Sequence, residues 1–144
     1  LGGYFGSRLM SNIREEKGYT YGIGSYNVTM PLAAYWMIAT DVNADQAEAT
    51  IEECMKEIRR LQTEPVPEEE LHLVKSYFNG ELLRELDGAF AQSDALKHKL
   101  NYGIDNTFYL RTIDRIRTCT AEDIMRMANK YLQPEDMYIV TAGK

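Results

Sequence analysis

The stretch SRLMSNIREEKGYTYGIGS, residues 7–25, joins a short apolar helix pattern to a run rich in glycine and tyrosine. Leu9 and Ile13 recur at helical spacing, and a run of four charged residues follows them. Gly18 then stands where a left-handed residue ends a helix. The aromatic and β-branched residues at 19–26 are typical of a strand. The pattern predicts a helix that ends at Gly18 and a turn that brings a helical arginine close to strand tyrosines. A plain helix–strand joint with solvated charges would have the same residues.

The composition of the chain limits the classes of protein to which it can belong. Its 144 residues are 44% hydrophobic and 26% charged, as expected of a single globular domain over residues 1–144. The net charge of −6 argues against a nucleic-acid-binding surface. The longest uncharged stretch, 19–40, contains Gly, Asn and Pro, so we expect no membrane insertion. The chain begins at Leu1 rather than at a methionine, so we expect it to be a segment of a longer parent, and no compartment is assigned to it.

Periodic patterns along the rest of the chain predict a second strand, a group of helices and a closing strand. The strands are expected at 34–42 and 137–142, and the helices at 44–61, 68–86, 89–100, 108–116 and 124–132. Helices grouped beside a few strands indicate an α+β fold, with an antiparallel-dominated sheet packed against the helices. Three strands are few for such a sheet. We therefore expect an upstream strand beyond the N-terminal edge, and an open sheet edge through which the segment self-associates.

Local signals add finer expectations about the helices. Thr120 and Asp123 form an N-cap pair for the last helix. Asp87-Gly88 and the Asn101-Tyr102-Gly103 run should interrupt the helical pattern. In the helix that begins near Glu68, the spacing predicts a buried stripe made of Leu71, Val74, Phe78, Leu82 and Leu86.

Residues that carry metal chemistry are few. His72 and His98 each stand without a second histidine or cysteine at ligand spacing, and the patterns H-E-x-x-H and H-x-x-E-H are absent. Cys54 falls on the apolar face of its helix, which favours a buried free thiol. The acidic residues at 52–53 and 68–70 are typical of solvated helix faces. We therefore expect no metal site within the chain, and interpret both histidines as surface residues.

A glycine-rich stretch, Gly2 to Ser7, opens the first helix, and N–H groups at a helix start attract anions. A small-molecule module with an anion-binding loop is therefore one alternative function. The motif is incomplete, because no strand precedes it and no G-K-[ST] follows it. A serine nucleophile is no better supported, because the G-x-S-x-G elbow is absent.

One group of motifs is specific enough to indicate a protein family. Its members are Leu1-Gly2-Gly3, Ser7-Arg8-Leu9, and Ile13 to Gly18 followed by Tyr21. This pattern closely resembles the C-terminal, non-zinc domain of the pitrilysin/insulinase family of zinc metallopeptidases, to which the mitochondrial processing peptidase subunits belong. Softer matches occur at Pro67 to Leu71 and at Thr118 to Leu132. The resemblance covers essentially the whole chain.

The resemblance implies that two homologous α+β halves close like a clamshell. In that arrangement the N-terminal half holds zinc and the general base, and the C-terminal half contributes an arginine and a tyrosine, here Arg14 and Tyr21. These two catalytic and substrate-binding residues would hold the peptide carbonyl and stabilise the charge that its oxygen gains during hydrolysis. Tyr19 and Tyr26 are rivals for the tyrosine's role, and only the spacing favours Tyr21.

The resemblance also implies partners, because the metal ligands are missing here. Zinc is expected in the full-length protein or complex, and this segment alone should be inactive. Its partners would be a peptide substrate and a zinc-bearing N-terminal domain or partner subunit. The implied function is that of the substrate-binding and transition-state-stabilising domain of a zinc-dependent metalloendopeptidase. The alternative is a non-catalytic scaffold, or a processing-complex subunit, of the same fold.

Overall fold

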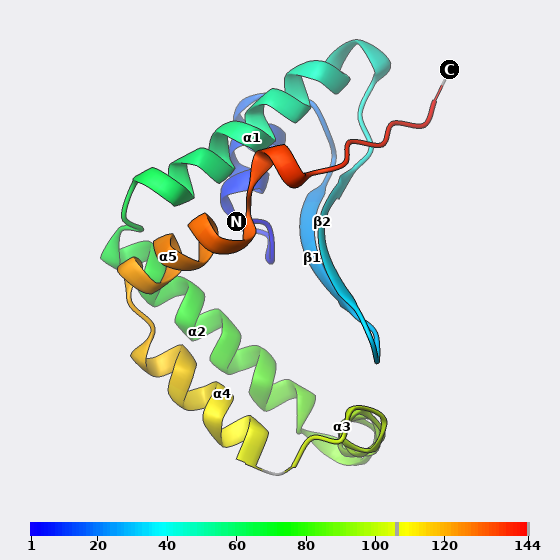
Figure 1. The fold of residues 1–144 in the computed structure, drawn as a ribbon, viewed down its shortest axis with the longest axis vertical. Helices are drawn as coiled ribbons and strands as arrows, with labels where there is room; N and C mark the ends of the chain where they lie inside the picture. The colour runs from blue at the N-terminus through cyan, green and yellow to red at the C-terminus, as the bar shows by residue number, and fades with distance from the viewer. Residues whose placement is uncertain (106, 144) are drawn as a thin grey trace. The chain divides into compact units, whose positions relative to one another are not determined.

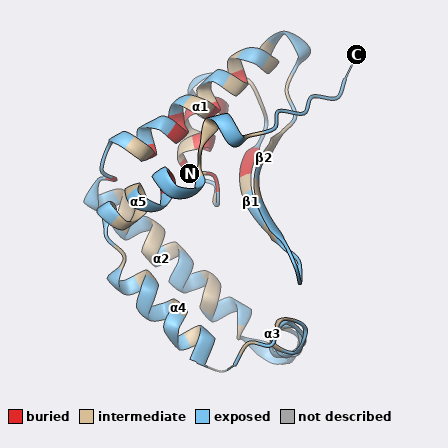
Figure 2. Ribbon diagram, viewed as in Figure 1, coloured by how far each residue is buried: buried red, intermediate tan, exposed pale blue. Residues whose placement is uncertain are grey.

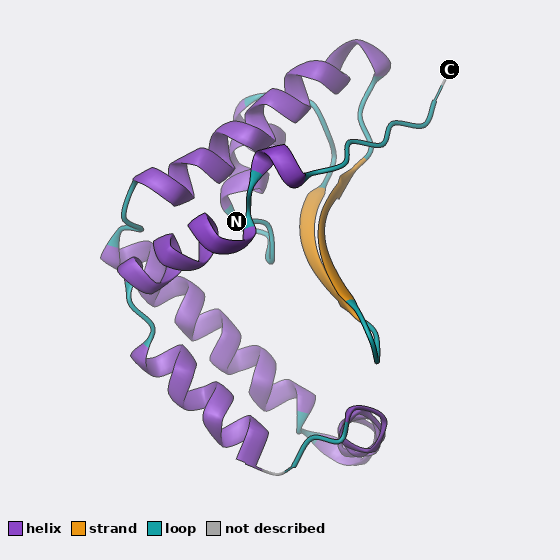
Figure 3. Cartoon of the chain, in the orientation of Figure 1, coloured by secondary structure: helices purple, strands orange, loops and turns teal. Residues whose placement is uncertain are grey.

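The computed structural model describes residues 1–105 and 107–143 (Figures 1 and 3). The described residues form two compact units. Unit 1 contains Leu1–Glu64 and the chain from Met125 onward, and unit 2 contains Pro65–Ile124. Unit 1 carries all the strands found among these residues, whereas unit 2 is helical.

Unit 1 is built from one π-helix, a hairpin and a long helix, followed by the end of the chain. Its elements are η1 (Met10–Glu16), β1 (Ile23–Thr29), β2 (Ala34–Thr40), the 3-10 turn η2 (Ala44–Gln46), α1 (Ala47–Thr63), the C-terminal part of α5 (Ala121–Tyr131) and the 3-10 turn η3 (Pro134–Asp136). The end of α1 is joined to α5 because Gln62 Nε2 donates to Leu132 O at 2.7 Å and Asn129 Nδ2 donates to Gln62 O at 2.8 Å.

The hairpin is antiparallel, with Ile23 opposite Thr40 at one end and Thr29 opposite Ala34 at the other. Alternation of side chains along each strand gives the hairpin two different faces. One face carries Ile23, which is buried, and the other carries Tyr26, which is half-exposed.

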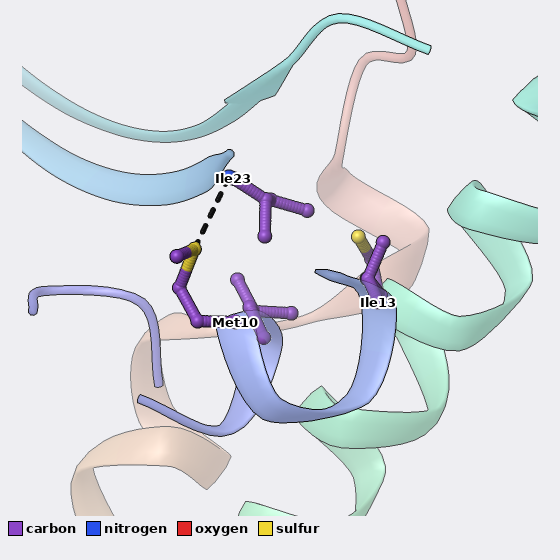
Figure 4. Close-up of a cluster of buried hydrophobic side chains, with 5 residues drawn as sticks. Met10, Ile13 and Ile23 are labelled. Carbon is purple, nitrogen blue, oxygen red and sulfur yellow. Dashed lines mark hydrogen bonds between the residues drawn. The ribbon is translucent and has the colours of Figure 1, made fainter. Parts of the chain in front are cut away.

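The core of unit 1 lies where η1, β1 and α1 meet (Figures 2 and 4). Leu9 and Ile13 are fully buried, and they pack in a cluster that includes Met10, Ile23 and Cys54. Ile23 N–H donates to Met10 Sδ at 3.4 Å, which joins the hairpin to η1 within this cluster (Figure 4). Full burial of each large aliphatic side chain contributes about 1.5–3 kcal/mol.

Unit 2 consists of α2 (Glu68–Glu85), α3 (Gly88–Tyr102), α4 (Thr107–Thr118) and the first residues of α5. Lys75 Nζ donates to Arg117 O at 3.1 Å and links α2 to α4. The prediction of a buried stripe on α2 is wrong: no residue of that helix is buried, and Phe78 is 46% exposed. α3 lies across the end of α2 rather than along it (Figure 1), and Leu71, Val74, Leu82 and Leu86 are only partly buried.

Helix ends in unit 2 follow the sequence signals. Gly88 and Gly103 both have positive φ, 86° and 62°, at the two predicted interruptions. Thr120 N–H donates to Asp123 Oδ2, and Asp123 N–H donates to Thr120 Oγ1, each at 3.2 Å. This reciprocal cap confirms the predicted pair at the start of α5.

Two strand predictions need correction. β1 begins at Ile23 and not at position 19, because residues 19–22 form a turn that is bonded to the end of β2. The closing strand at 137–142 is absent from the described chain, in which this segment is extended and Tyr138 is 97% exposed. Alternating apolar residues favour a strand, but a strand also needs a neighbour to pair with. None of the described helices is both long and apolar enough to span a bilayer.

Candidate functional site

The turn at Gly18 reverses the chain between η1 and β1. Gly18 has a φ of 67°, the left-handed conformation that glycine adopts without steric cost. Lys17 N–H donates to Asn12 O at 3.0 Å and closes the wide last turn of η1. Tyr19 N–H reaches across the glycine to Ile13 O, also at 3.0 Å. The predicted left-handed cap is confirmed, and the chain folds back toward η1.

Two threonine hydroxyls hold the next residues, the 19–22 loop, against the end of β2. Thr20 Oγ1 lies 2.7 Å from Asp41 O and accepts the Gly22 N–H at 3.1 Å. Thr40 Oγ1 lies 3.0 Å from Thr20 Oγ1 and 2.9 Å from Gly22 O. The loop is therefore fixed through its backbone, which leaves the side chain at its tip exposed.

Arg14 and Tyr21 meet at this loop. Arg14 Nε donates to Tyr21 O at 3.0 Å, and the guanidinium carbon lies 4.7 Å from the centre of the Phe5 ring. Glu15 Oε1 lies 3.8 Å from Arg14 Nη1. The Tyr21 side chain is fully exposed, and no hydrogen bond among the described residues joins its phenol to the guanidinium. The structure thus brings the arginine to the tyrosine's backbone and leaves the phenol open to solvent.

The rival tyrosines occupy different environments. Tyr19 is partly buried and packs against the core cluster. Tyr26 is 53% exposed, and its ring lies over Gly24, where an added Cβ would be 2.5 Å from the phenol oxygen. Of the three tyrosines, only Tyr21 combines a carbonyl that accepts from Arg14 with a fully exposed side chain, so the geometry favours it for a role beside the arginine.

A buried polar cluster behind Arg14 is not visible in the sequence pattern. Asn12 Nδ2 donates to Glu53 Oε2 at 2.9 Å and to Glu57 Oε1 at 2.8 Å. Asn12 is 8% exposed and Glu57 only 2%. The amide of Asn12 is the main cause that lowers the pKa of Glu53, and the cations of Lys56 and Lys17 lower it further. The expectation that Glu53 lies on a solvated face is therefore wrong.

The glycine-rich start of the chain serves packing against β1. Ser25 N–H donates to Gly2 O at 2.8 Å, and Leu9 N–H donates to Leu1 O at 3.0 Å. A Cβ added at Gly2 would lie 2.7 Å from Ser25 N and 2.8 Å from Leu9 Cδ1. The glycine is thus required by close contact with a strand, which favours a structural role over the anion-binding loop.

The described residues contain no group of three or more His, Cys, Asp and Glu side chains that could hold a metal ion. His72 and His98 are both exposed on helices, as predicted. Cys54 is a buried free thiol, and desolvation raises its pKa to about 11, which makes the thiolate scarce near neutral pH. Within residues 1–105 and 107–143, the side chains do not offer the ligand set that zinc needs.

A family model described as the peptidase M16 inactive domain matches residues 1–78. The chain belongs to this family. The resemblance to the C-terminal domain of pitrilysin-type zinc proteases is thereby confirmed. An uncharacterized zinc protease of Rickettsia felis is 30% identical over 132 residues, which cover 90% of this chain and 31% of that protein. A second such protein, from Rickettsia bellii, is 27% identical over 132 residues. The chain thus spans about a third of the length of these relatives.

Solved structures give the same fold. A peptidase M16 inactive domain from Pseudomonas fluorescens superposes with a TM-score of 0.79 at 25% identity, covering 92% of this chain and 32% of that one. A protease from Helicobacter pylori has a TM-score of 0.80 at 19% identity, with 92% and 32% covered. A chain of complex III2 from Candida albicans has a TM-score of 0.69 at 18% identity, with 89% and 32% covered. The α+β fold with an antiparallel sheet and grouped helices is confirmed as that of the M16 C-terminal domain.

Proposed function

We propose that this chain is the substrate-binding half of a zinc metalloendopeptidase, in which Arg14 and Tyr21 contact the carbonyl of the peptide bond to be cut. The observation that carries the proposal is the 3.0 Å bond from Arg14 Nε to Tyr21 O, which holds a guanidinium at the backbone of a residue whose side chain is fully exposed. Membership of the M16 family and the two relatives named zinc proteases support it.

The chemistry suits these two side chains. Hydrolysis of a peptide bond places negative charge on the carbonyl oxygen, and fixed donors near that oxygen stabilise the charge. The Nε bond to Tyr21 O and the contact with Phe5 restrict the guanidinium plane, so its terminal N–H groups have a defined direction. The exposed Tyr21 phenol can donate from a loop whose backbone is fixed by two threonines.

The metal lies outside this chain in the proposal. Zinc supplies the water-activating chemistry from a preceding domain or a partner subunit, and the residues described here bind and orient the peptide. Because the segment lacks that chemistry, it is inactive alone and forms one domain of a larger peptidase. A scaffold of the same fold remains the alternative function, since the family description itself is that of an inactive domain.

The outer edge of β1 offers a second contact to an extended peptide. Ser25 N–H points away from β2 and is already bonded to Gly2 O, so the edge is available to a peptide only beyond Ser25. Asn27, two residues further along, has its backbone groups on the same edge by the alternation of an antiparallel ladder. A peptide added there by β-augmentation would run beside the strand that leaves the Arg14 site. The same open edge allows a second copy of the segment to pair with it.

The test uses the natural full-length protein with its partner, if one copurifies. Arg14→Ala and Tyr21→Phe should each lower the rate of peptide hydrolysis by about 10²–10³, because each removes one donor to the developing charge. Zinc per chain, measured by native mass spectrometry, should stay unchanged in both variants.

Matched controls are available in the same chain. Tyr138→Phe removes an equally exposed phenol and Arg59→Ala removes an exposed guanidinium, and both should hydrolyse peptide at the native rate. Full activity of Arg14→Ala and Tyr21→Phe would overturn the assigned roles. A native protein that binds zinc in no chain of its complex would favour the scaffold instead.

A further inference from the structure

We propose that Asn12 is a positioning residue that holds Arg14 in the candidate site, by locking the π-helical turn from which Arg14 projects. The inference rests on the proposed function of Arg14 and extends it to a residue buried behind the site. It comes from the side-chain contacts of Asn12, which no sequence motif indicates.

Asn12 joins η1 to α1 through both hydrogens of its amide. One hydrogen goes to Glu53 Oε2 at 2.9 Å and the other to Glu57 Oε1 at 2.8 Å. Glu57 is itself held by Arg60, whose Nη1 donates to its two oxygens at 3.0 and 3.2 Å. An amide has two N–H donors, and both find a carboxylate here. The side chain is therefore fixed in position and in orientation.

The backbone carbonyl of Asn12 closes the wide, π-helical turn at the end of η1. It accepts the Lys17 N–H five residues on, the bond that defines a π-turn. Such turns are rare and occur frequently at functional sites, because they displace the following side chains around the helix axis. Arg14 lies within this turn, so its direction depends on whether the turn keeps its wide form or tightens to an α-helix.

The residue type also fits this role. Asn12 Oδ1 is buried and accepts no hydrogen bond within the described part of the chain. An apolar residue would avoid that orphaned acceptor but would remove one donor from each of two partly or fully buried carboxylates. An aspartate would set a third carboxylate against Glu53 and Glu57. An amide at this position is thus the choice that keeps η1 bound to α1.

The consequence for Arg14 is geometric. Arg14, whose Nε must reach Tyr21 O at 3.0 Å, lies two positions after the locked side chain of Asn12. If the tether is lost, the turn can tighten, and the guanidinium rotates away from the 19–22 loop. The loop itself keeps its own bonds to Thr40 and Asp41, so the arginine moves and the tyrosine stays.

The first experiment follows the Arg14 Nε–H resonance by NMR in the natural full-length protein, and it needs no activity. Asn12→Leu should speed its exchange with solvent by about tenfold, because the bond to Tyr21 O opens more often. Glu53→Ala, which removes one of the two acceptors and should fold readily, should give a smaller increase. Cys54→Ala loosens the same core without touching Asn12 and should leave the exchange unchanged. Unchanged exchange in both Asn12→Leu and Glu53→Ala would overturn the proposal.

The second experiment is a double-mutant cycle on peptide hydrolysis. Asn12→Leu should lower kcat by about tenfold in the native background and leave it unchanged in an Arg14→Ala background, because its effect passes through Arg14. A merely structural role would lower kcat equally in both backgrounds and would overturn the proposal. If Arg14→Ala alone retains full activity, the proposed function fails, and the exchange experiment then decides whether Asn12 positions Arg14.

Discussion

Unit 1 and unit 2 use apolar residues in different ways. In unit 1, Leu9, Ile13 and Ile58 are fully buried, and the candidate site stands directly on that core. In unit 2, apolar side chains of comparable size lie in solvent, among them Leu83, 72% exposed, and Phe90, 90% exposed. Figure 2 shows the buried residues gathered in η1, β1 and α1. Amphipathic helices form in both units, but among the described residues all the buried hydrophobic side chains except that of Val66 lie in unit 1.

This difference in burial explains why the candidate site lies in unit 1. Catalytic side chains must be held to within a fraction of an ångström, and packed supporting residues provide that restraint. Arg14 projects from a helix whose neighbours Leu9 and Ile13 are fully buried and whose Asn12 is bonded to α1. The helices of unit 2 are held by caps and a few contacts, so the same precision is not available there.

The largest expected difference between the two units is in the free energy of unfolding lost when a leucine is shortened to alanine. Leu9→Ala should destabilise unit 1 by about 2–5 kcal/mol, because the side chain is fully buried and leaves a cavity. Leu83→Ala, the same change at an exposed position of α2, should cost about 0.5 kcal/mol or less. Urea unfolding monitored by the single tryptophan, Trp36 in β2, reports unit 1, and far-UV circular dichroism reports the helices. Equal costs at the two positions would contradict the comparison.

The sequence predicts the local features of both units well. Gly18, Gly88 and Gly103 mark the three positive-φ turns, and the Thr120–Asp123 pair marks the start of α5. Each of these depends on a few neighbouring residues and on one conformational preference. The turn predicted at Gly18 also brings the helical Arg14 to Tyr21, where the structure finds the guanidinium bonded to the tyrosine's backbone carbonyl.

Burial and long-range contacts could not be predicted in the same way. The stripe on α2 has the right period, but periodicity does not say whether another element covers it. Asn12 and Glu53 lie 41 positions apart, and nothing local marks them as partners. The closing segment has a strand pattern without a strand neighbour in the described chain. The choice of the Tyr21 carbonyl as the acceptor for Arg14 could not be predicted either, because every residue has a backbone carbonyl.

The second prediction concerns close backbone contact in unit 1. Gly2→Ala should destabilise the protein by about 1–3 kcal/mol, because its Cβ would lie 2.7 Å from Ser25 N, a backbone atom that cannot move freely. Gly3→Ala is the matched control, since an added Cβ there meets nothing within 4 Å. The Trp36 unfolding transition measures both variants. A neutral Gly2→Ala would show that the N-terminal segment is loosely bound to β1.

The third prediction sets a turn of unit 1 against a helix interior of unit 2. Gly18→Ala should cost about 1 kcal/mol, because its φ of 67° is unfavourable for any residue with a Cβ. Gly80→Ala, within α2 and with open space around the added Cβ, should instead stabilise by about 0.5–1 kcal/mol. Thermal unfolding by circular dichroism should move the two transitions in opposite directions. Shifts of the same sign would show that Gly18 is not held in the left-handed conformation in solution.

The smallest expected effect is on how much stability the protein loses as the pH falls. The pKa of Glu53 lies below its ordinary value of 4.5, chiefly because Asn12 donates to the carboxylate, so the folded state binds fewer protons than the unfolded state. Its contribution is therefore present above about pH 4.5 and is lost as the pH falls through the lower folded value. In unit 2 the pKa of Asp105, whose side chain is exposed, is also lowered, chiefly because the Thr107 hydroxyl donates to the carboxylate.

Glu53→Gln and Asp105→Asn measure the two contributions by urea unfolding from about pH 7 to pH 3. Both variants should lose less free energy of unfolding between about pH 7 and pH 3 than the native protein does. The reduction should be larger for Glu53→Gln. The reason is that Glu53 lies on the side of α1 that contacts η1, with its side chain 17% exposed, and water screens its interactions less than it screens those of Asp105. An equal or larger effect from Asp105→Asn would mean that the Asn12–Glu53 bond is open in solution. It would then weaken the link between α1 and Arg14, because that link begins at this bond.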